Sequence, residues 1–250
     1  MAGRSAPGAA LVPRAFDLLG AFDEQHRSLA LAELAERTGL ASSTTLRIAR
    51  QLVDVGALER RGDGRYVVGR RIWDLGLLAP VEQDLREIAS PYLHDLHAAT
   101  RATVHLAVRE DTRVLYLDRL AGRASVPVVS RVGTHLPLHA TGVGKVLLAH
   151  APESVVLEVL GDLPRLTAHT VTQPGVLAAQ LERVRREGHA TTAEEMTLGA
   201  CSAAVPIRAG GDGAVVAALG VVVPSLRRDR ARLVAALEVA AQGIGRRLRR

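Results

Sequence analysis

The first candidate for chemistry is the stretch LPLHATGVGKVLLAH, residues 136–150. Two glycines there flank a valine, and the only lysine of the chain follows. This composition is typical of loops that bind phosphate. The nucleotide-binding pattern G-x-x-x-x-G-K-[ST], however, requires glycine at the position of His139 and serine or threonine at the position of Val146. Because a bound magnesium ion would lack its hydroxyl ligand, we do not expect a nucleotide site.

The same stretch predicts the start of a helix, and two interpretations of it remain open. Gly142, Val143 and Gly144 would begin the helix, where free backbone N–H groups and the helix dipole favour an anion such as a small carboxylate. Alternatively, the glycines form a plain turn that lets the helix pack closely on a sheet. In that second interpretation Lys145 is a first-turn side chain whose ammonium group reaches water.

Cys201 and the adjacent residues Glu194 and Glu195 are the other candidates for catalysis. Cys201 is the only cysteine, and His189 or His139 could act as its base, but no cysteine-protease or redox signature surrounds it. A small residue on an apolar strand is more often part of a core. Adjacent carboxylates diverge on a helix and on a strand, so a general acid–base pair is not expected. We therefore expect no enzyme activity.

Two histidine pairs have spacings that could bind a metal ion: His94 with His97, and His135 with His139. Neither pair is accompanied by cysteine or carboxylate residues in a ligand pattern. We predict no metal site and no cofactor.

The charge distribution indicates an anionic partner for the N-terminal third. The chain has 250 residues, which is enough for two domains, and a formal net charge of +6. Residues 37–71 contain eight arginines and only three acidic residues. Such a concentration favours nucleic acid as the partner, although the preference for arginine over lysine also fits simple codon bias.

No feature of the sequence indicates export or membrane insertion. Residues 1–14 contain no apolar run long enough for a signal peptide. No stretch approaches the roughly 20 apolar residues of a membrane span, and a single cysteine suits a reducing compartment. We expect a cytoplasmic protein that does not bind membranes.

The elements predicted before residue 72 follow the order of a winged helix-turn-helix. Apolar residues at helical spacing predict helices over residues 11–24, 28–40 and 41–56. Residues 62–64, Gly-Asp-Gly, then form a tight turn between two short strands, which predicts a hairpin.

The third of these helices has the surface that a DNA-reading helix needs. Its outer face carries small, polar and basic side chains that can enter a major groove about 12 Å wide. Arg47 is the predicted base-reading residue, because a guanidinium group can bind guanine O6 and N7 together. Ser42 or Ser43 is the predicted N-cap, and arginines around the hairpin turn would contact phosphates or the minor groove. The predicted DNA contacts are Ser42, Ser43, Thr44, Arg47, Arg50, Arg60, Arg61 and Arg65.

After residue 101 the pattern changes to a mixture of strands and helices. Strands are predicted over residues 102–110, 112–120 and 125–133, and a hairpin is predicted around the GGDG turn. A helix is predicted over residues 142–150, and an amphipathic helix closes the chain.

Three motifs, in this order, resemble the IclR family of bacterial transcriptional regulators. LAELAERTGLASSTTLRIARQLVDVGALER followed by GRYVVGRRIWDLG is similar to the DNA-binding half of that family. LPLHATGVGKVLLA is similar to the motif that opens a central helix of its ligand-binding domain. EEMTLGACSAAVPIRAGGDGAVVAALGVVVP is similar to its C-terminal signature. The resemblance covers residues 11–248.

The resemblance implies an α+β chain. It would have a winged helix-turn-helix DNA-binding domain over residues 11–71, a linker helix over 72–90 and a GAF-like, mixed α/β effector-binding domain over 91–250. Members of this family are homodimers, often paired into tetramers, and bind near-palindromic operator DNA. Carried over to this chain, the resemblance implies an effector pocket lined by Ser125, Val128, Leu136, Gly142, Val143, Thr192 and Ser202.

The functional hypothesis is a transcription factor that controls a metabolic or catabolic operon, with a small organic acid shifting its affinity for the operator. Two other classes remain. A small-molecule enzyme could be built on the C-terminal domain, but the sequence shows no convergent nucleophile, base and metal set. A winged-helix adaptor that binds protein would show no steep salt dependence of DNA binding.

Overall fold

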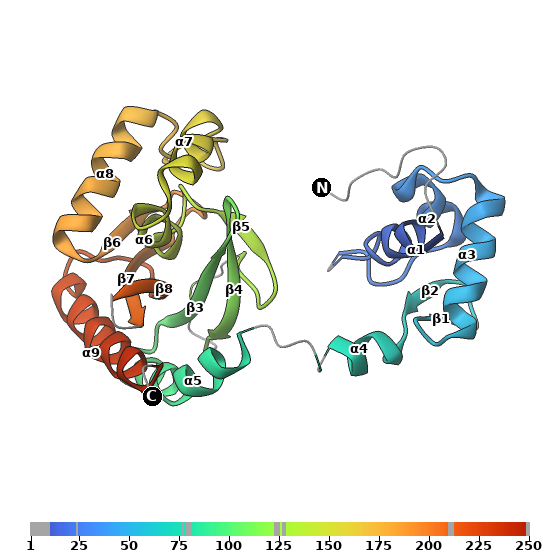
Figure 1. Cartoon of the computed structure of the whole chain (residues 1–250), viewed down its shortest axis with the longest axis horizontal. Coiled ribbons are helices and arrows are strands. Elements are labelled where there is room, and N and C mark those ends of the chain that lie inside the picture. Colours follow the sequence, from blue (N-terminus) through green and yellow to red (C-terminus); the bar gives the residue numbers. More distant parts are fainter. Residues whose placement is uncertain are drawn as a thin grey trace. The chain divides into compact units, whose positions relative to one another are not determined.

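The computed structural model describes residues 11–23, 25–76, 78, 82–122, 126, 129–209 and 213–248. The chain divides into two compact units, unit 1 (Met1–Val81) and unit 2 (Glu82–Arg250) (Figure 1). The elements of unit 1 are α1 (Leu11–Leu19), α2 (Leu31–Thr38), α3 (Ser42–Asp54), β1 (Leu58–Arg60), β2 (Tyr66–Val68) and α4 (Arg70–Gly76).

A small apolar core holds the helices of unit 1 together. Leu18 of α1, Leu34 of α2 and Ile48 of α3 are all buried, because each helix places its apolar residues on one face. Gly39 ends α2 with a φ of 69°, a region that glycine enters without steric cost. β1 and β2 pair as antiparallel strands. The winged helix-turn-helix predicted for this part of the chain is confirmed.

The start of α3 differs from the prediction. Neither Ser42 nor Ser43 is the N-cap, because the extended backbone that an N-cap requires falls one residue earlier, at Ala41 (φ −60°, ψ 140°). Ser42 and Ser43 are the first two helical residues, and both are exposed. Neither serine hydroxyl group is therefore the cap of the helix.

The predicted linker helix, residues 72–90, is divided between two helices. α4 ends at Gly76, and α5 spans Gln83–Thr100. α5 continues past the predicted limit because Leu93 and Leu96 are buried in the core of unit 2. Most of the predicted linker that follows α4 is therefore part of the fold of unit 2.

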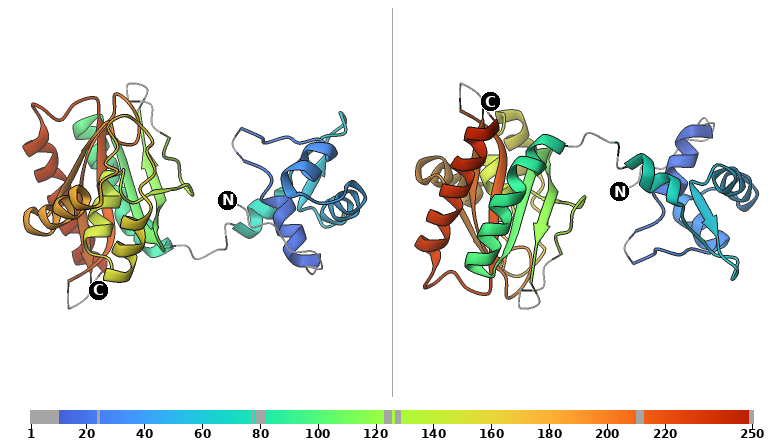
Figure 2. Two further views of the ribbon diagram at one scale, coloured as in Figure 1. Left: turned by 90° about the horizontal axis from the view of Figure 1, so that it is seen from above. Right: turned by 90° about the horizontal axis from the view of Figure 1, so that it is seen from below.

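Unit 2 contains a six-stranded antiparallel sheet with the strand order β5-β4-β3-β8-β7-β6. Beside α5, its elements are β3 (Thr103–Glu110), β4 (Arg113–Leu120), β5 (His135–Pro137), α6 (Gly142–Ala149), α7 (Glu153–Gly161), α8 (Pro174–Glu187), β6 (Ala190–Ala193), β7 (Cys201–Ala209), β8 (Ala214–Val223) and α9 (Arg230–Leu248). Helices α5 and α9 cover one face of the sheet, and α6, α7 and α8 cover the other (Figure 2). The predicted α+β class, the hairpin of β7 and β8 and the helix from Gly142 are confirmed. Within the described ranges, no helix is long and apolar enough to cross a membrane.

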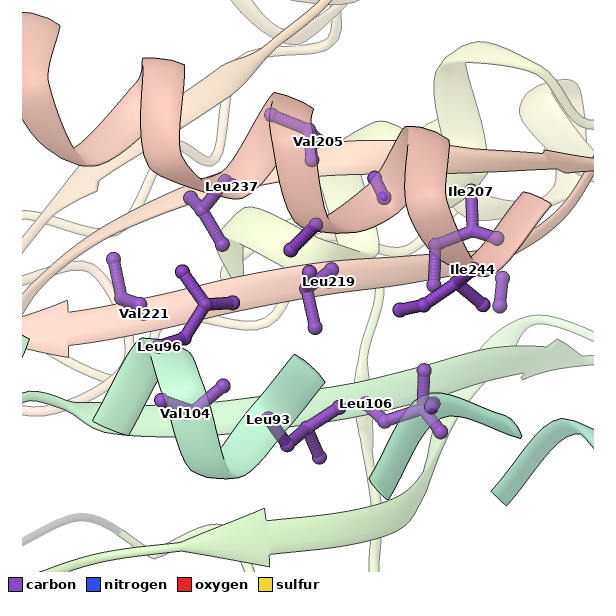
Figure 3. Packing of buried hydrophobic residues seen from close by; sticks show 14 of the residues in the cluster. Leu93, Leu96, Val104, Leu106, Val205, Ile207, Leu219, Val221, Leu237 and Ile244 are labelled. Atoms are coloured by element: carbon purple, nitrogen blue, oxygen red, sulfur yellow. The ribbon is translucent and has the colours of Figure 1, made fainter. Parts of the chain in front are cut away.

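Alternation along the central strands creates a separate core on each face of the sheet. Val104 and Leu106 of β3 pack with Leu219 of β8 and Leu237 of α9 beneath the α5–α9 layer (Figure 3). Because successive side chains of a strand point to opposite faces, His105 between them lies on the face that α6 covers. His105 is thereby placed beneath α6, the helix whose first residues belong to the predicted effector pocket.

One predicted strand, residues 125–133, is wrong in the part that the structure describes. Residues 129–133 form bends and turns, and the strand that pairs with β4 is β5, further along the chain. Gly133 has a φ of 82°, and its N–H donates to Tyr116 O at 2.8 Å. The valine-rich composition favours a strand, but the chain has to turn here before β5 can pair with β4.

Candidate functional site

The outer face of α3 is open to solvent. Ser42, Ser43, Arg47 and Arg50 are exposed, and Thr44 is half-buried. Among the described residues, neither arginine side chain has an ion-pair or hydrogen-bond partner. The N-terminal turn of the helix adds free backbone N–H groups and the positive end of the helix dipole. This face can therefore donate hydrogen bonds to anionic groups and to base edges.

The three arginines of the hairpin lie in different environments. Arg61 is exposed, and its guanidinium group has no partner in the described part of the chain. Arg60 is exposed too, with its guanidinium carbon 5.9 Å from the ring centroid of Tyr66, a cation–π arrangement that leaves its N–H groups accessible. Arg65, by contrast, is half-buried and is bound within unit 1.

Arg65 ties the hairpin to the start of α2. Its Nη2 donates to Glu33 Oε2 at 2.7 Å and to Ser28 O at 2.8 Å. The same Glu33 oxygen accepts the N–H of Ala30 at 2.6 Å. This hydrogen bond and the charge of Arg65 lower the pKa of Glu33. The contacts favour a positioning role for Arg65, and its predicted contact with DNA stays a prediction.

One cavity of unit 2 brings together the residues of the predicted effector pocket. It lies where the start of α6 meets the sheet and the segment between β6 and β7. Ser125 and Val128 lie outside the described residues. The volume of the cavity is about 50 Å³, enough for water but small beside the roughly 300 Å³ of a typical ligand pocket. The predicted residues that line it are Leu136, Gly142, Val143, Thr192 and Ser202.

Two glycines let the start of α6 lie directly against its neighbours. A Cβ atom at Gly142 would lie 2.5 Å from Ser202 Oγ, and one at Gly144 would lie 2.3 Å from Leu138 O. Neither glycine has a positive φ. The absence of a side chain is therefore required by close packing, as the second interpretation of the motif predicts.

The first turn of α6 also faces the cavity with its backbone. Thr141 is the N-cap, and its hydroxyl accepts the N–H of Gly144 at 3.1 Å. The N–H groups of Gly142 and Val143, which precede it, have no carbonyl partner within the helix. Because both residues line the cavity, their donors and the positive end of the helix dipole are available there. The geometry therefore also supports the anion interpretation.

A buried histidine–serine pair, which sequence reasoning missed, adds to the polar lining. His105 Nε2 lies 2.7 Å from Ser130 Oγ, and the His105 ring meets the Tyr116 ring edge-on with centroids 5.0 Å apart. Burial lowers the pKa of His105 to about 3, and the charge of Arg119 acts in the same direction. The imidazole is therefore neutral and carries one donor and one acceptor nitrogen. The only sequence signal was a histidine within the β-rich run of residues 102–110.

Hydroxyl and apolar groups complete the cavity. Thr192 Oγ1 and Ser202 Oγ are 2.6 Å apart on paired positions of β6 and β7. Thr197 adds another hydroxyl group, while Leu136 and Met196 are apolar. Among the described residues that line the cavity, none is Asp, Glu, Lys or Arg. A carboxylate would therefore meet hydrogen-bond donors and no opposing negative charge.

Lys145 does not reach water, which corrects the interpretation made from the sequence. Its side chain is 1% exposed, and Nζ lies 2.6 and 2.7 Å from the two carboxylate oxygens of Glu195. A third contact joins Nζ to Gln180 Oε1 at 2.7 Å. Burial lowers the pKa of Lys145, and the charge of Glu195 opposes this effect. The prediction failed because the partner that makes burial tolerable lies 50 residues away in the chain.

The remaining candidates for chemistry have structural neighbours. Cys201 is half-buried at the start of β7 and is paired with aliphatic residues on both adjacent strands. His135 pairs with Glu110, and His139 Nε2 lies 3.1 Å from Pro164 O. Within the described part of the chain, no group of three or more His, Cys, Asp or Glu residues could hold a metal ion.

Two family models match the chain, and each match lies entirely or almost entirely within one of the two units. The model of the IclR helix-turn-helix domain matches residues 11–62. The model described as bacterial transcriptional regulator IclR C-terminal matches residues 79–246.

Individual relatives extend this match over nearly the whole chain. The HTH-type transcriptional regulator KdgR of Dickeya chrysanthemi is 30% identical over 239 residues, which cover 93% of this chain and 78% of KdgR. The transcriptional repressor IclR of Escherichia coli strain K12 is 30% identical over 191 residues, which cover 74% of this chain and 70% of the repressor. A crystal structure of an IclR homolog from Microbacterium hydrocarbonoxydans, complexed with 4-hydroxybenzoate, has a TM-score of 0.89 and 35% identity, and the match covers 96% of this chain and 99% of that one. The chain thus belongs to the IclR family of bacterial transcriptional regulators.

Proposed function

We propose that this regulator binds operator DNA as a homodimer through unit 1 and changes its operator affinity when a small carboxylate enters the cavity of unit 2. The observation that carries the proposal is the convergence of the predicted pocket residues on one cavity at the start of α6. Because its target is DNA in a bacterial cell, we expect it to act in the cytoplasm.

The DNA-binding part of the proposal rests on the surface of unit 1. α3 would enter the major groove, where Arg47 and Arg50 reach base edges and phosphates and the serines at its start donate to phosphate. Arg60 and Arg61 of the hairpin would contact the backbone. In a dimer, the two α3 helices would meet half-sites about 34–36 Å apart, or a multiple of that distance.

The ligand part of the proposal rests on the chemistry of the cavity. Backbone N–H groups at the start of α6 would bind the carboxylate, and the hydroxyl groups and neutral His105 would bind a second polar group. The relative complexed with 4-hydroxybenzoate supports an aromatic acid as the first compound to test. The cavity volume of about 50 Å³ is well below that of a typical ligand pocket, so we propose that its walls move apart when a ring enters. That movement would make one arrangement of the unit bind ligand better, as a population shift requires.

The dimer is supported by the apolar residues that unit 1 leaves exposed. Phe16 of α1 is 69% exposed, and Trp73 and Leu75 of α4 are 65% and 56% exposed. We propose that these side chains form one exposed patch, since contiguous apolar patches favour a protein–protein contact. We propose that a second copy covers them and that dimers can pair further into tetramers.

A gel-shift titration with the DNA upstream of its own gene and of neighbouring genes tests DNA binding. We expect a sequence-specific complex whose affinity falls steeply with salt, because phosphate contacts release counterions. The absence of any specific complex, at every salt concentration and with every compound tried, would contradict the proposal. A shallow salt dependence would favour a protein-binding adaptor.

Thermal shift with 4-hydroxybenzoate and other small acids tests the cavity. A ligand that binds only the folded state at 100 times its Kd stabilises it by about 2.7 kcal/mol. Ala200→Leu should abolish the shift, because Ala200 lines the cavity and a larger side chain fills it. Ala98→Leu adds the same side chain on the exposed face of α5 and should leave the shift intact. Equal effects of the two variants would rule out this cavity as the binding site.

A further inference from the structure

The buried contact between Lys145 and Glu195 joins two parts of the cavity wall. Lys145 lies in the first turn of α6, two residues beyond Val143, which lines the cavity. Glu195 belongs to the segment between β6 and β7, residues 194–200, which we call the wall segment. Met196, Thr197 and Ala200 of that segment line the cavity directly.

This contact uses every hydrogen-bond donor of the Lys145 ammonium group. All three Nζ donors of Lys145 have acceptors: both oxygens of Glu195, at 2.6 and 2.7 Å, and Gln180 Oε1, at 2.7 Å. Lys145 is 1% and Glu195 8% exposed as side chains. The ammonium group is thus fixed from three directions, with α8 as the third support.

The wall segment has no strand or helix of its own, so discrete contacts hold it. Glu194 has a φ of 58°, in the left-handed region. Its carbonyl oxygen accepts the hydroxyl of Thr167, and the carbonyl oxygen of Glu195 accepts the hydroxyl of Thr170, both at 2.7 Å. The N–H of Gly199 donates to the Glu194 carboxylate at 2.9 Å. The Glu195 carboxylate ties this segment to α6 through Lys145.

Stability alone does not account for a buried ion pair. The cost of removing two charges from water offsets most of their attraction, and well-packed apolar residues at such sites are often as stable. Apolar contacts have no preferred direction, whereas the three hydrogen bonds fix the position of the ammonium group relative to its acceptors. The benefit of this pair is therefore expected in the geometry of the wall segment.

We propose that Lys145 and Glu195 are positioning residues that hold the wall segment against the start of α6 and thereby set the shape and the ligand affinity of the cavity. This inference deepens the proposed function, and its ligand consequence rests on that function. The positioning itself is independent of any ligand.

Amide hydrogen exchange of the ligand-free, full-length protein tests the positioning. In Lys145→Met/Glu195→Leu we expect the melting temperature to stay close to that of the wild type, because no unpaired charge is left buried. We expect the amides of the wall segment to exchange at least about tenfold faster, since their local anchor is gone. The labelling rate of Cys201, the only cysteine, should rise with them, because it directly follows the segment.

Two further variants separate positioning from general stability. Glu195→Asp keeps both charges but shortens the side chain, and should accelerate exchange in the wall segment to a smaller extent. Leu181→Ala removes a buried side chain of α8, beside Gln180, and should lower the melting temperature while leaving native-state exchange of the wall segment unchanged. The proposal would be overturned if the wall segment exchanged and Cys201 was labelled at wild-type rates in both Glu195→Asp and the double variant.

The ligand consequence is measured with 4-hydroxybenzoate as the probe. If the wild type binds it, the double variant should bind at least about tenfold more weakly, and Leu181→Ala should bind equally well. Equal affinity of the wild type and the double variant would contradict the role in affinity. If the wild type does not bind the probe, that result counts against the proposed ligand, while the exchange measurement still decides the positioning.

Discussion

At the scale of single residues, Arg47 makes the sharpest prediction for DNA recognition. Arg47→Ala should weaken binding to the specific operator by about 1–3 kcal/mol and leave binding to random DNA nearly unchanged, because it removes a contact to a base edge. Competitive gel shifts with both DNAs measure the two losses.

Arg61→Ala is the matched control for this comparison. Arg61 is exposed on the hairpin and is expected to contact phosphate, so its loss should weaken binding to both DNAs equally and reduce the salt slope by about 1. Equal losses on both DNAs for Arg47→Ala would contradict its base-reading role.

His105 predicts a dependence of stability on pH. Above about pH 6.5 the histidine is neutral in both the folded and the unfolded chain. As the pH falls from 6.5 toward 3, only the unfolded chain takes up the proton, because burial holds the pKa of His105 in the folded state at about 3. The free energy of unfolding should therefore fall by about 1.4 kcal/mol per pH unit in this window on account of His105.

Urea unfolding between pH 4.5 and 7.5 measures this slope. His105→Gln should lower the measured slope by this contribution, and the same substitution at the exposed His169 should leave the slope unchanged. Parallel curves for the wild type and His105→Gln would show that His105 is not the group responsible.

At the scale of elements, the packing of α6 depends on a glycine. Gly144→Ala should destabilise the protein by about 1–3 kcal/mol, because its Cβ would lie 2.3 Å from Leu138 O and 2.4 Å from Thr141 Oγ1. Gly175→Ala in α8 is the control, since no atom lies within 4 Å of its added Cβ, and it should cause no loss. Thermal or urea unfolding measures both, and an equal effect of the two substitutions would argue against the tight contact.

The elements themselves were largely predictable from sequence. Helix periodicity and glycine turns are local properties, so the helix from Gly142 and both hairpins were found. The strand expected over residues 125–133 is wrong in its described part, residues 129–133, and the predicted N-cap of α3 is wrong as well, because a turn and the local backbone overrode composition there. Five of the predicted pocket residues converge, but they were found by resemblance to a family rather than by any local pattern.

At the scale of the whole molecule, the exposed apolar residues of unit 1 predict its assembly. Phe16→Ser/Trp73→Ser should weaken self-association and, with it, operator binding, because a single unit meets only one half-site. Sedimentation at several concentrations measures the association. Leu157→Ser, at an exposed apolar position of α7 in unit 2, is the control. An unchanged association constant in the double variant would place the dimer contact elsewhere.

The sequence by itself determined the family, the order of the elements and the basic face of α3, because motifs, periodicity and charge are written along the chain. Only the tertiary structure decided the partners of individual side chains. Arg65 meets Glu33 across 32 residues, His105 meets Ser130 across 25, and Lys145 meets Glu195 across 50. No local pattern predicts such contacts, because a charged or polar side chain is buried only where the fold brings a distant partner to it. The lysine that suggested a phosphate loop is for this reason a buried link between α6 and the wall segment.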